Sequence, residues 1–206
     1  MRIRLRMRFT AWLQALCQGL VCAVCVCGAS LAAALGVDGL QLPDTFAVDG
    51  KNLQVNGAGS RLYSLLRIKV YSAALYTTAK TSSASDLLQS TQPHVVHIKM
   101  RLSAKRADAI KAWDYYLNAN CSAPCVLPEP ARAAFFKAMA DLKTGDEESY
   151  IFTTQGLSIQ RNGVVVASMA DLTLAKMVLA AWIGDEPTTP ELKAALLGLN
   201  AGASSR

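Results

Sequence analysis

Two segments in which polar and apolar side chains alternate constrain the fold most strongly. In residues 65–76, one face carries Ile68, Val70, Ser72, Ala74 and Tyr76, and the other carries Arg67, Lys69, Tyr71, Ala73 and Leu75. In residues 94–102, one face carries Val96, Ile98, Met100 and Leu102, and the other carries His97, Lys99 and Arg101. A period of two is typical of β-strands with one buried face. The chain therefore has to form a sheet that is covered on at least one side.

Short turn sequences add hairpins to this sheet. Asp49-Gly50 separates residues 45–48 from residues 51–55, and residues 37–45 before them are expected to be an irregular lead-in. Asn162-Gly163 joins the last two of three further strands, expected over residues 149–154, 157–161 and 164–168. Asn-Gly and Asp-Gly favour the two-residue turns that connect antiparallel neighbours. We therefore expect a mainly antiparallel sheet.

Apolar residues spaced three and four apart predict helices between and after these strands. One helix is expected from the N-cap Ser103 to about Asn118, and the last helix follows a capping box formed by Thr188 and Glu191. Strands followed by helices, then strands and helices again, are typical of an α+β fold and not of βαβ units. The helices that would cover the apolar face of the sheet span residues 104–118, 129–142 and 170–183.

The first 34 residues have the pattern of a secretory signal peptide. Four arginines lie in the first eight residues, an apolar stretch runs from Ala11 to Leu35, and residues 32–34 are Ala-Ala-Ala. A basic start, an apolar middle and a small-residue cleavage site predict export, and hence a periplasmic or secreted protein that begins near Leu35. The alternative is a retained membrane anchor, because about 20 apolar residues span a bilayer. Residues 35–206 would then form a single domain.

The charge balance changes when this segment is removed. The full chain has 21 Lys and Arg residues against 15 Asp and Glu residues. Without the four N-terminal arginines, 17 basic residues face 15 acidic ones, which is nearly neutral. Such a balance does not call for a nucleic-acid partner or an anionic membrane surface, and we expect no stable membrane span after cleavage.

Only two of the six cysteines, Cys121 and Cys125, remain after the signal segment. In an oxidising compartment we expect them to form a short-loop disulfide. Free thiols or half of a metal site are the alternatives. The spacing differs from the C-x-x-C of redox motifs, and only His94 and His97 are available as further soft ligands, so we expect no metal and no cofactor.

Familiar catalytic signatures are absent from the sequence. There is no Walker A motif, no H-E-x-x-H, no G-x-S-x-G and no EF-hand loop. His97 is expected to be a structural, half-exposed residue. Gly57-Ala58-Gly59 is too short for a dinucleotide-binding loop, and we interpret it as a bulge or tight bend between strands.

The remaining candidate site consists of Arg61, Lys69 and Tyr71, with Trp113 nearby. Arginine is a planar donor of fixed charge, and tyrosine adds a hydroxyl, so together they are suited to hold a carboxylate or phenolate oxygen. If these donors open onto an apolar cleft beside Trp113, they would orient an amphiphilic ligand. The alternative is that Arg61 and Lys69 are ordinary surface charges.

Several motifs resemble those of the chalcone isomerase-like family. They are residues 55–61 (Val-Asn-Gly-Ala-Gly-Ser-Arg), residues 68–76 (Ile-Lys-Val-Tyr-Ser-Ala-Ala-Leu-Tyr), residues 143–146 (Lys-Thr-Gly-Asp), residues 179–187 (Leu-Ala-Ala-Trp-Ile-Gly-Asp-Glu-Pro) and residues 196–198 (Leu-Leu-Gly). The resemblance spans about residues 48–198 and is closest to the bacterial secreted branch of that family. It implies an open-faced β-sandwich, in which a large antiparallel sheet lies under a layer of helices beside a small extra sheet.

The resemblance also implies a ligand cleft between sheet and helices. Plant members of the family close a flavanone ring there, and related plastid proteins bind fatty acids in the same cleft. Arg61 matches the arginine with which both groups hold an anionic oxygen. The other catalytic positions of the isomerases correspond to Tyr71, Ala107, Asp114 and Ser168, which do not reproduce the donor set of the isomerases.

We therefore expect a secreted domain that binds a small amphiphilic anion such as a fatty acid. One alternative is an isomerase (intramolecular lyase) of altered substrate. Another is an envelope interaction module whose cleft is collapsed and filled. The sequence identifies no protein partner.

Overall fold

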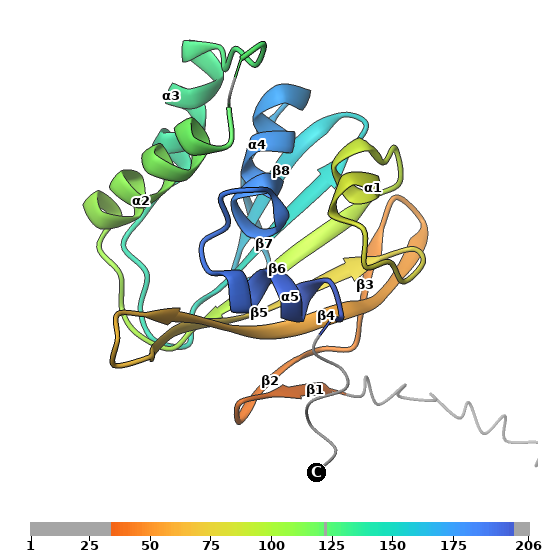
Figure 1. Ribbon diagram of the computed structural model, residues 1–206, viewed down its shortest axis with the longest axis vertical. Coiled ribbons are helices and arrows are strands. Elements are labelled where there is room, and N and C mark those ends of the chain that lie inside the picture. Colours follow the sequence, from red (N-terminus) through yellow and green to blue (C-terminus); the bar gives the residue numbers. More distant parts are fainter. Residues whose placement is uncertain (1–33, 122, 200–206) are drawn as a thin grey trace, which may run out of the picture. The chain divides into compact units, whose positions relative to one another are not determined.

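The computed structural model describes residues 34–121 and 123–199 and shows an α+β fold. Its main feature is a curled, seven-stranded sheet, in which each strand is antiparallel to its neighbours (Figure 1). The strands follow one another in sequence order: β3 (Thr45–Val48), β4 (Lys51–Tyr63), β5 (Ile68–Thr77), β6 (His94–Met100), β7 (Glu147–Thr153), β8 (Gly156–Arg161) and β9 (Val164–Met169). The predicted antiparallel sheet is thus confirmed.

Helices cover one face of this sheet, which we call the inner face (Figure 1). They are α1 (Ala84–Gln89), α2 (Arg106–Ala119), α3 (Glu129–Ala138), α4 (Leu172–Ile183) and α5 (Pro190–Leu196). Helix α4 is almost entirely apolar and nine of its residues are buried, which makes it the centre of the core. The predicted open-faced sandwich, a large sheet under a layer of helices, is confirmed.

Apolar side chains pack on both faces of the sheet. The larger cluster lies between the inner face and the helices and includes Leu75, Ile159 and Trp182. The smaller cluster lies on the opposite, outer face, where Ala74 and Tyr76 of β5 are fully buried. Strand β5 is therefore covered on both sides, which explains why its second half is an apolar run.

Residues 37–45, predicted to be irregular, form a β-hairpin instead. Strand β1 (Ala34–Val37) pairs with β2 (Leu40–Pro43) through a turn at Asp38 and Gly39, where both residues have positive φ. Val37 and Leu42 are buried in the outer cluster. The segment is too short for its alternation to be recognised, and it becomes a strand pair because it covers the outer face.

The glycine-rich segment lies inside β4, so it is not a bend between strands. A register shift between Val55 and Gly57 does form the predicted bulge. The glycines are needed because α5 crosses this strand closely. A Cβ on Gly57 would lie 2.1 Å from the carbonyl oxygen of Ala195, and one on Gly59 would lie 2.7 Å from the Ala195 Cβ.

Helix α2 starts later than predicted. Ser103 is not its N-cap, because Ala104 pairs with Leu142 in an isolated bridge and the helix begins at Arg106. The Asp141 carboxylate accepts a hydrogen bond from the Arg106 backbone N–H at 2.8 Å. A side chain 35 residues away thus satisfies a helix-start donor, which local sequence patterns do not reveal.

The predicted disulfide between Cys121 and Cys125 is present in the structure. It closes the start of the loop between α2 and α3. The predicted signal segment, residues 1–34, lies almost wholly outside the described residues. Within the described part of the chain, no helix is both long and apolar enough to cross a bilayer.

Candidate functional site

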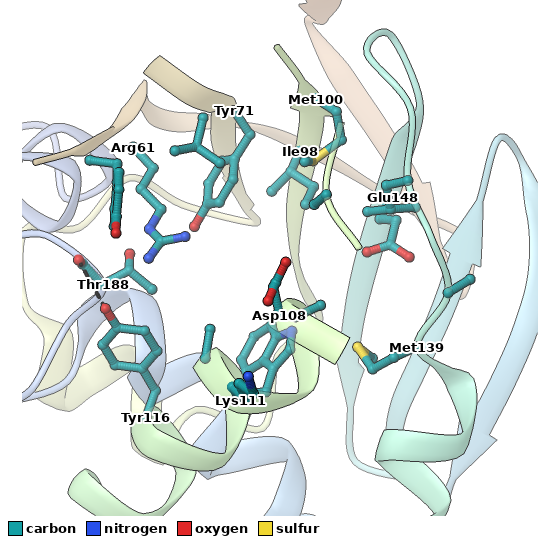
Figure 2. Close-up of a pocket in the computed structure, with 18 of the residues that line it drawn as sticks. Arg61, Tyr71, Ile98, Met100, Asp108, Lys111, Tyr116, Met139, Glu148 and Thr188 are labelled. Carbon is teal, nitrogen blue, oxygen red and sulfur yellow. Dashed lines mark hydrogen bonds between the residues drawn. The ribbon is translucent and has the colours of Figure 1, made fainter. Parts of the chain in front are cut away.

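A pocket of about 630 Å³ lies between the inner face of the sheet and helix α2 (Figure 2). This volume is in the range of small-molecule sites. Residues from β4, β5, β6, β7, α2 and α4 contribute to its lining, together with the segment before α5. The predicted cleft is therefore open, which argues against the alternative of a collapsed and filled cleft.

Most of the pocket wall is apolar. Trp113 of α2 and Trp182 of α4 meet edge to face, with ring centroids 5.2 Å apart. Tyr150 of β7 contacts both indoles, and its ring centroid lies 4.9 Å from that of Trp182. Ile98, Met100 and Met139 extend the wall. Such a surface suits a hydrocarbon chain or an aromatic ring, because it offers contact area with few competing polar groups.

Arg61 and Lys111 both contribute positive charge to the pocket lining, and Arg61 is the less exposed of the two. Arg61 lies on β4 opposite Tyr71 of β5, and its guanidinium carbon is 5.9 Å from the centroid of the Tyr71 ring. Its Nε is buried and has no hydrogen-bond partner among the described residues. Buried donors are normally paired. An arginine that points into a cavity with unused donors is therefore a candidate to bind an anion.

The hydroxyl of Tyr71 lies beside this arginine and is oriented by Trp182. The Trp182 indole N–H donates a hydrogen bond to the Tyr71 oxygen at 3.0 Å. Because this bond uses a lone pair of the oxygen, the O–H hydrogen remains available for donation. Burial raises the pKa of Tyr71, against the opposing charge of Arg61, so the hydroxyl stays protonated at neutral pH.

Thr188 completes this end of the pocket. Its buried Oγ1 makes no well-formed hydrogen bond to a described residue but lies near enough to the Tyr71 hydroxyl to lower the pKa of that group, and its backbone N–H donates to the Ala181 carbonyl at 2.7 Å. Tyr116 of α2 reaches the Thr188 carbonyl with its hydroxyl at 3.4 Å. Figure 2 shows Arg61, Tyr71, Thr188 and Tyr116 grouped at one end of the pocket. We call this group the donor cluster.

The opposite end of the pocket carries an acidic group that is already neutralised. Glu148 is 2% exposed, and one of its oxygens accepts two hydrogen bonds from Arg161, at 2.7 and 2.9 Å. Its other oxygen accepts from the Tyr150 hydroxyl at 2.8 Å. Burial, with the charge of Glu148, holds the pKa of Tyr150 well above its ordinary value. Because its donors are already used by Glu148, this end offers none to an anionic ligand, whereas the donor cluster does; Asp108 of α2, an exposed acid, also lines the pocket (Figure 2).

The structure brings three of the four predicted ligand-binding residues together. Arg61, Tyr71 and Trp113 all line the pocket. Lys69 does not, because the register shift between Arg61 and Leu62 turns it to the outer face, where its Nζ lies 2.7 Å from the Asp38 carboxylate. Strict alternation placed Lys69 with Tyr71, and the bulge is the reason that this placement is wrong.

The other positions suggested by the family resemblance do not form a catalytic set. Asp114 points to Arg132 of α3, with which it forms an ion pair. Ser168 shares a hydrogen bond with Ser158 on the neighbouring strand β8. Neither these two residues nor Ala107 lines the pocket. Among the described residues, no three His, Cys, Asp or Glu side chains are grouped in a way that would hold a metal ion.

Sequence patterns missed Tyr116, Thr188 and Glu148 as pocket residues. Thr188 was interpreted as part of a helix-capping box, whereas Thr189 caps α5 and leaves the Thr188 hydroxyl to the pocket. Glu148 lies in an acidic run that is typical of a solvated loop. The strand expected over residues 149–154 was the available signal. In the structure this strand begins at Glu147, and Glu148 pairs with Ile98 of β6.

His97 differs from the prediction of a half-exposed residue. It is 3% exposed, because Phe46 of β3 covers its ring and Ser149 contacts its Nδ1 at 2.9 Å. It lies on the outer face of the sheet and does not line the pocket.

Comparisons with known proteins agree with this geometry. A model of the family described as chalcone isomerase-like matches residues 34–198. The chain belongs to the chalcone isomerase-like family. The matched residues include every strand and helix of the fold, and the donor cluster lies within them.

A solved structure shares the fold of this family member. It is a fatty-acid binding protein from Arabidopsis thaliana, with a TM-score of 0.65 and 16% sequence identity. The superposition covers 79% of this chain and 94% of the plant chain. At this identity, the likeness shows a shared fold. No curated protein matches the sequence of the chain.

Proposed function

We propose that the protein binds a small amphiphilic anion, such as a fatty acid, with its charged head on the donor cluster. The observation that carries this proposal is Arg61, which lines the pocket and whose buried Nε is a donor that no described residue satisfies. A carboxylate between Arg61 and the Tyr71 hydroxyl would satisfy that donor. The hydrocarbon tail would lie along the aromatic wall formed by Trp113, Tyr150 and Trp182.

The plant protein that shares this fold supports the choice of ligand class, since it is a fatty-acid binding protein. The paired state of Glu148 supports the direction of binding, because Arg161 and Tyr150 already donate to that carboxylate and leave no donor there for an anionic head. We further propose that the chain is exported and belongs to a bacterial secreted branch of the family. The basic and apolar pattern of residues 1–34 supports export.

An isomerase activity is the second candidate. Three donors around one point, Arg61, Tyr71 and Thr188, would also stabilise a phenolate or enolate oxygen. Ring closure of a hydroxychalcone requires this kind of stabilisation. A cyclisation assay followed by absorbance separates the two candidates, because a binding protein would hold the chalcone without converting it.

Calorimetric titration with a long-chain fatty acid tests the binding proposal. A charge-assisted hydrogen bond contributes roughly 1.5–3 kcal/mol, so Arg61→Ala should weaken binding by about 10- to 150-fold. Arg61→Lys should restore only part of the affinity, because an ammonium lacks the planar fork. Tyr71→Phe should cost about 0.5–1.5 kcal/mol of binding free energy, since it removes a neutral donor.

Melting curves serve as the control for each variant. Arg61→Ala should lower the melting temperature only slightly, because its Nε has no hydrogen-bond partner among the described residues and the guanidinium loses only its contact with the Tyr71 ring. Tyr71→Phe should lower it modestly, since the Trp182 indole N–H loses its partner. The proposal would be wrong if Arg61→Ala bound fatty acid as tightly as wild type. It would also be wrong if the wild type bound no fatty acid and Arg61→Ala were strongly destabilised, because Arg61 would then be a structural charge.

A further inference from the structure

The turn between β4 and β5 has an unusual composition. Turns are normally polar, but residues 62–69, which we call the β4–β5 tip, read Leu-Tyr-Ser-Leu-Leu-Arg-Ile-Lys. Leu65 is fully exposed, Leu66 is 82% exposed, and Tyr63 is 62% exposed. These side chains contribute nothing to the core, and together they form an apolar patch at the end of a hairpin.

The β4–β5 tip projects beyond the rest of the sheet. The pairing of β5 with β6 ends at Tyr71 and Met100, whereas β4 and β5 continue to pair with each other up to Tyr63 and Ile68. The tip is therefore a two-stranded ribbon that extends past its neighbour β6, at the lower left of Figure 1. Among the residues that the structure describes, two partly exposed ion pairs reach the tip, Arg67 with Glu191 and Lys69 with Asp38.

The tip is continuous with the pocket. Tyr63 and Val70, at the two sides of the ribbon, both line the pocket, and Arg61 of the donor cluster is two residues from Tyr63. On the other side of the opening, α2 presents Lys111, an exposed cation that also lines the pocket. A surface that holds the tip would thus meet the pocket at the end where we place the anionic head.

These observations point to a lipid layer as the partner. Apolar side chains flanked by cations, here Arg67 and Lys69, are the arrangement that places aromatic and aliphatic groups among headgroups while the charges contact lipid phosphates. Eight residues are too few to bury the roughly 800 Å² that each partner contributes to a stable protein interface. The ribbon shape therefore suits shallow insertion better than a second copy of the chain.

We propose that the β4–β5 tip inserts Leu65 and Leu66 into the interfacial layer of an anionic membrane, so that an amphiphile passes between the membrane and the pocket beside Tyr63. The passage of ligand rests on the proposed function, whereas the membrane contact does not. The contact is peripheral and reversible, since few apolar side chains insert and the two cations are partly neutralised by Asp38 and Glu191.

Flotation of the exported protein with vesicles of phosphatidylglycerol and phosphatidylethanolamine tests this contact. Leu65→Asp with Leu66→Asp should lower the vesicle partition coefficient by at least about tenfold, because each leucine contributes apolar transfer free energy. The matched control is Val164→Asp with Val165→Asp, an adjacent exposed pair on the β8–β9 hairpin, 66% and 57% exposed. It adds the same charge and should leave partition nearly unchanged.

The remaining measurements keep the two proposals apart. All variants are purified in the same form and begin at the same residue, so any contribution of the N-terminus cancels in the comparison. Binding of a soluble medium-chain fatty acid should be unchanged in the tip variant, which shows that the pocket is intact. If the wild-type protein bound vesicles but did not bind fatty acid, only the proposed function would be overturned. The membrane contact would be overturned if the tip variant bound vesicles as well as wild type does, or if the control pair lost as much binding as the tip variant. It would also be overturned if sedimentation showed a dimer of the wild type that the tip substitutions break.

Discussion

Arg61 and Arg101 lie on the two faces of the same sheet and have opposite hydrogen-bonding states. On the inner face, the Arg61 side chain makes no hydrogen bond to a described residue and points into the pocket. On the outer face, the Arg101 Nε donates to Ser72 at 2.9 Å, and its Nη2 donates to the carbonyl oxygens of Val37 and Asp38. One guanidinium is available to a ligand, whereas the other holds the β1–β2 hairpin on the sheet.

The difference extends to the groups around each arginine. Arg101 belongs to a closed network, because Ser72 also contacts Ser60, and Asp38 accepts from Ser60 and Lys69. The hydrogen bonds from Lys69 and Ser60 lower the pKa of Asp38, so its charge is retained over a wide pH range. The donor cluster on the inner face remains incomplete. Satisfied polar groups stabilise a fold, whereas unsatisfied ones beside a cavity indicate binding.

The largest effect on stability is expected from Arg101→Ala. The variant loses three hydrogen bonds that a charged donor makes, and it leaves the Val37 and Asp38 carbonyls without this donor while Ser72 keeps its contact with Ser60, so the free energy of unfolding should fall by about 2–4 kcal/mol. Urea denaturation measures this loss. Fatty-acid affinity in the same variant should stay within about threefold of wild type. If Arg101→Ala weakened binding as Arg61→Ala does, the division between the two faces would be wrong.

Acidification is expected to destabilise both faces through their buried histidines. Burial lowers the pKa of His94, which packs against Phe152 on the inner face, and of His97 on the outer face. The unfolded chain gains protons as pH falls below about 6.5, and the folded chain resists this, so stability rises with pH in that window. Each histidine contributes at most about 1.4 kcal/mol per pH unit.

Urea denaturation at a series of pH values between about 7.5 and 5.5 measures this slope. Replacing either histidine with asparagine should remove its share, and the size of that share compares the two faces directly. For His97, the charge of Glu147 opposes the lowering of the pKa and Lys99 adds to it. A free energy of unfolding that did not change over this range would contradict the prediction.

The smallest effect is expected from Lys69→Ala. Its ion pair with Asp38 is partly exposed, with 43% and 36% of the two side chains accessible, so its loss should cost about 0.2–1 kcal/mol of stability. Affinity for a fatty acid should not change, because Lys69 faces away from the pocket. Calorimetry and a melting curve on this variant test the correction made by the structure, since a loss of affinity would return Lys69 to the site.

Alternation along β5 and β6 predicted the faces of both strands well. Ala73 and Leu75 lie on the inner face and Ala74 and Tyr76 on the outer face, as the period of two requires. The pattern failed at Lys69 and Val70, where a bulge shifts the register so that Val70 lines the pocket together with Tyr71. A bulge depends on how two strands pair over a distance, and this information is not contained in one strand's own sequence.

The donor cluster was predicted in part for a related reason. Arg61 and Tyr71 were found through their chemistry and the family motif, but Tyr116 and Thr188 come from α2 and from the segment before α5. Those segments meet only because α4 and α5 fold back over the inner face. Arg61 and Thr188, which are 127 positions apart, thus line one pocket, and local periodicity does not predict contacts between such distant segments.

The sequence by itself determined the α+β class, the antiparallel hairpins, the helices and the family motif, and it favoured the pairing of Cys121 with Cys125. Each of these depends on spacing between near neighbours, which local sterics and hydrogen bonding decide. Only the tertiary structure decided that the lead-in is a hairpin, that Lys69 leaves the site, and that Arg61 remains unpaired while Arg101 does not. Hydrogen-bond satisfaction is a property of the whole packed chain, because a donor's partner can come from any segment that folding brings to it.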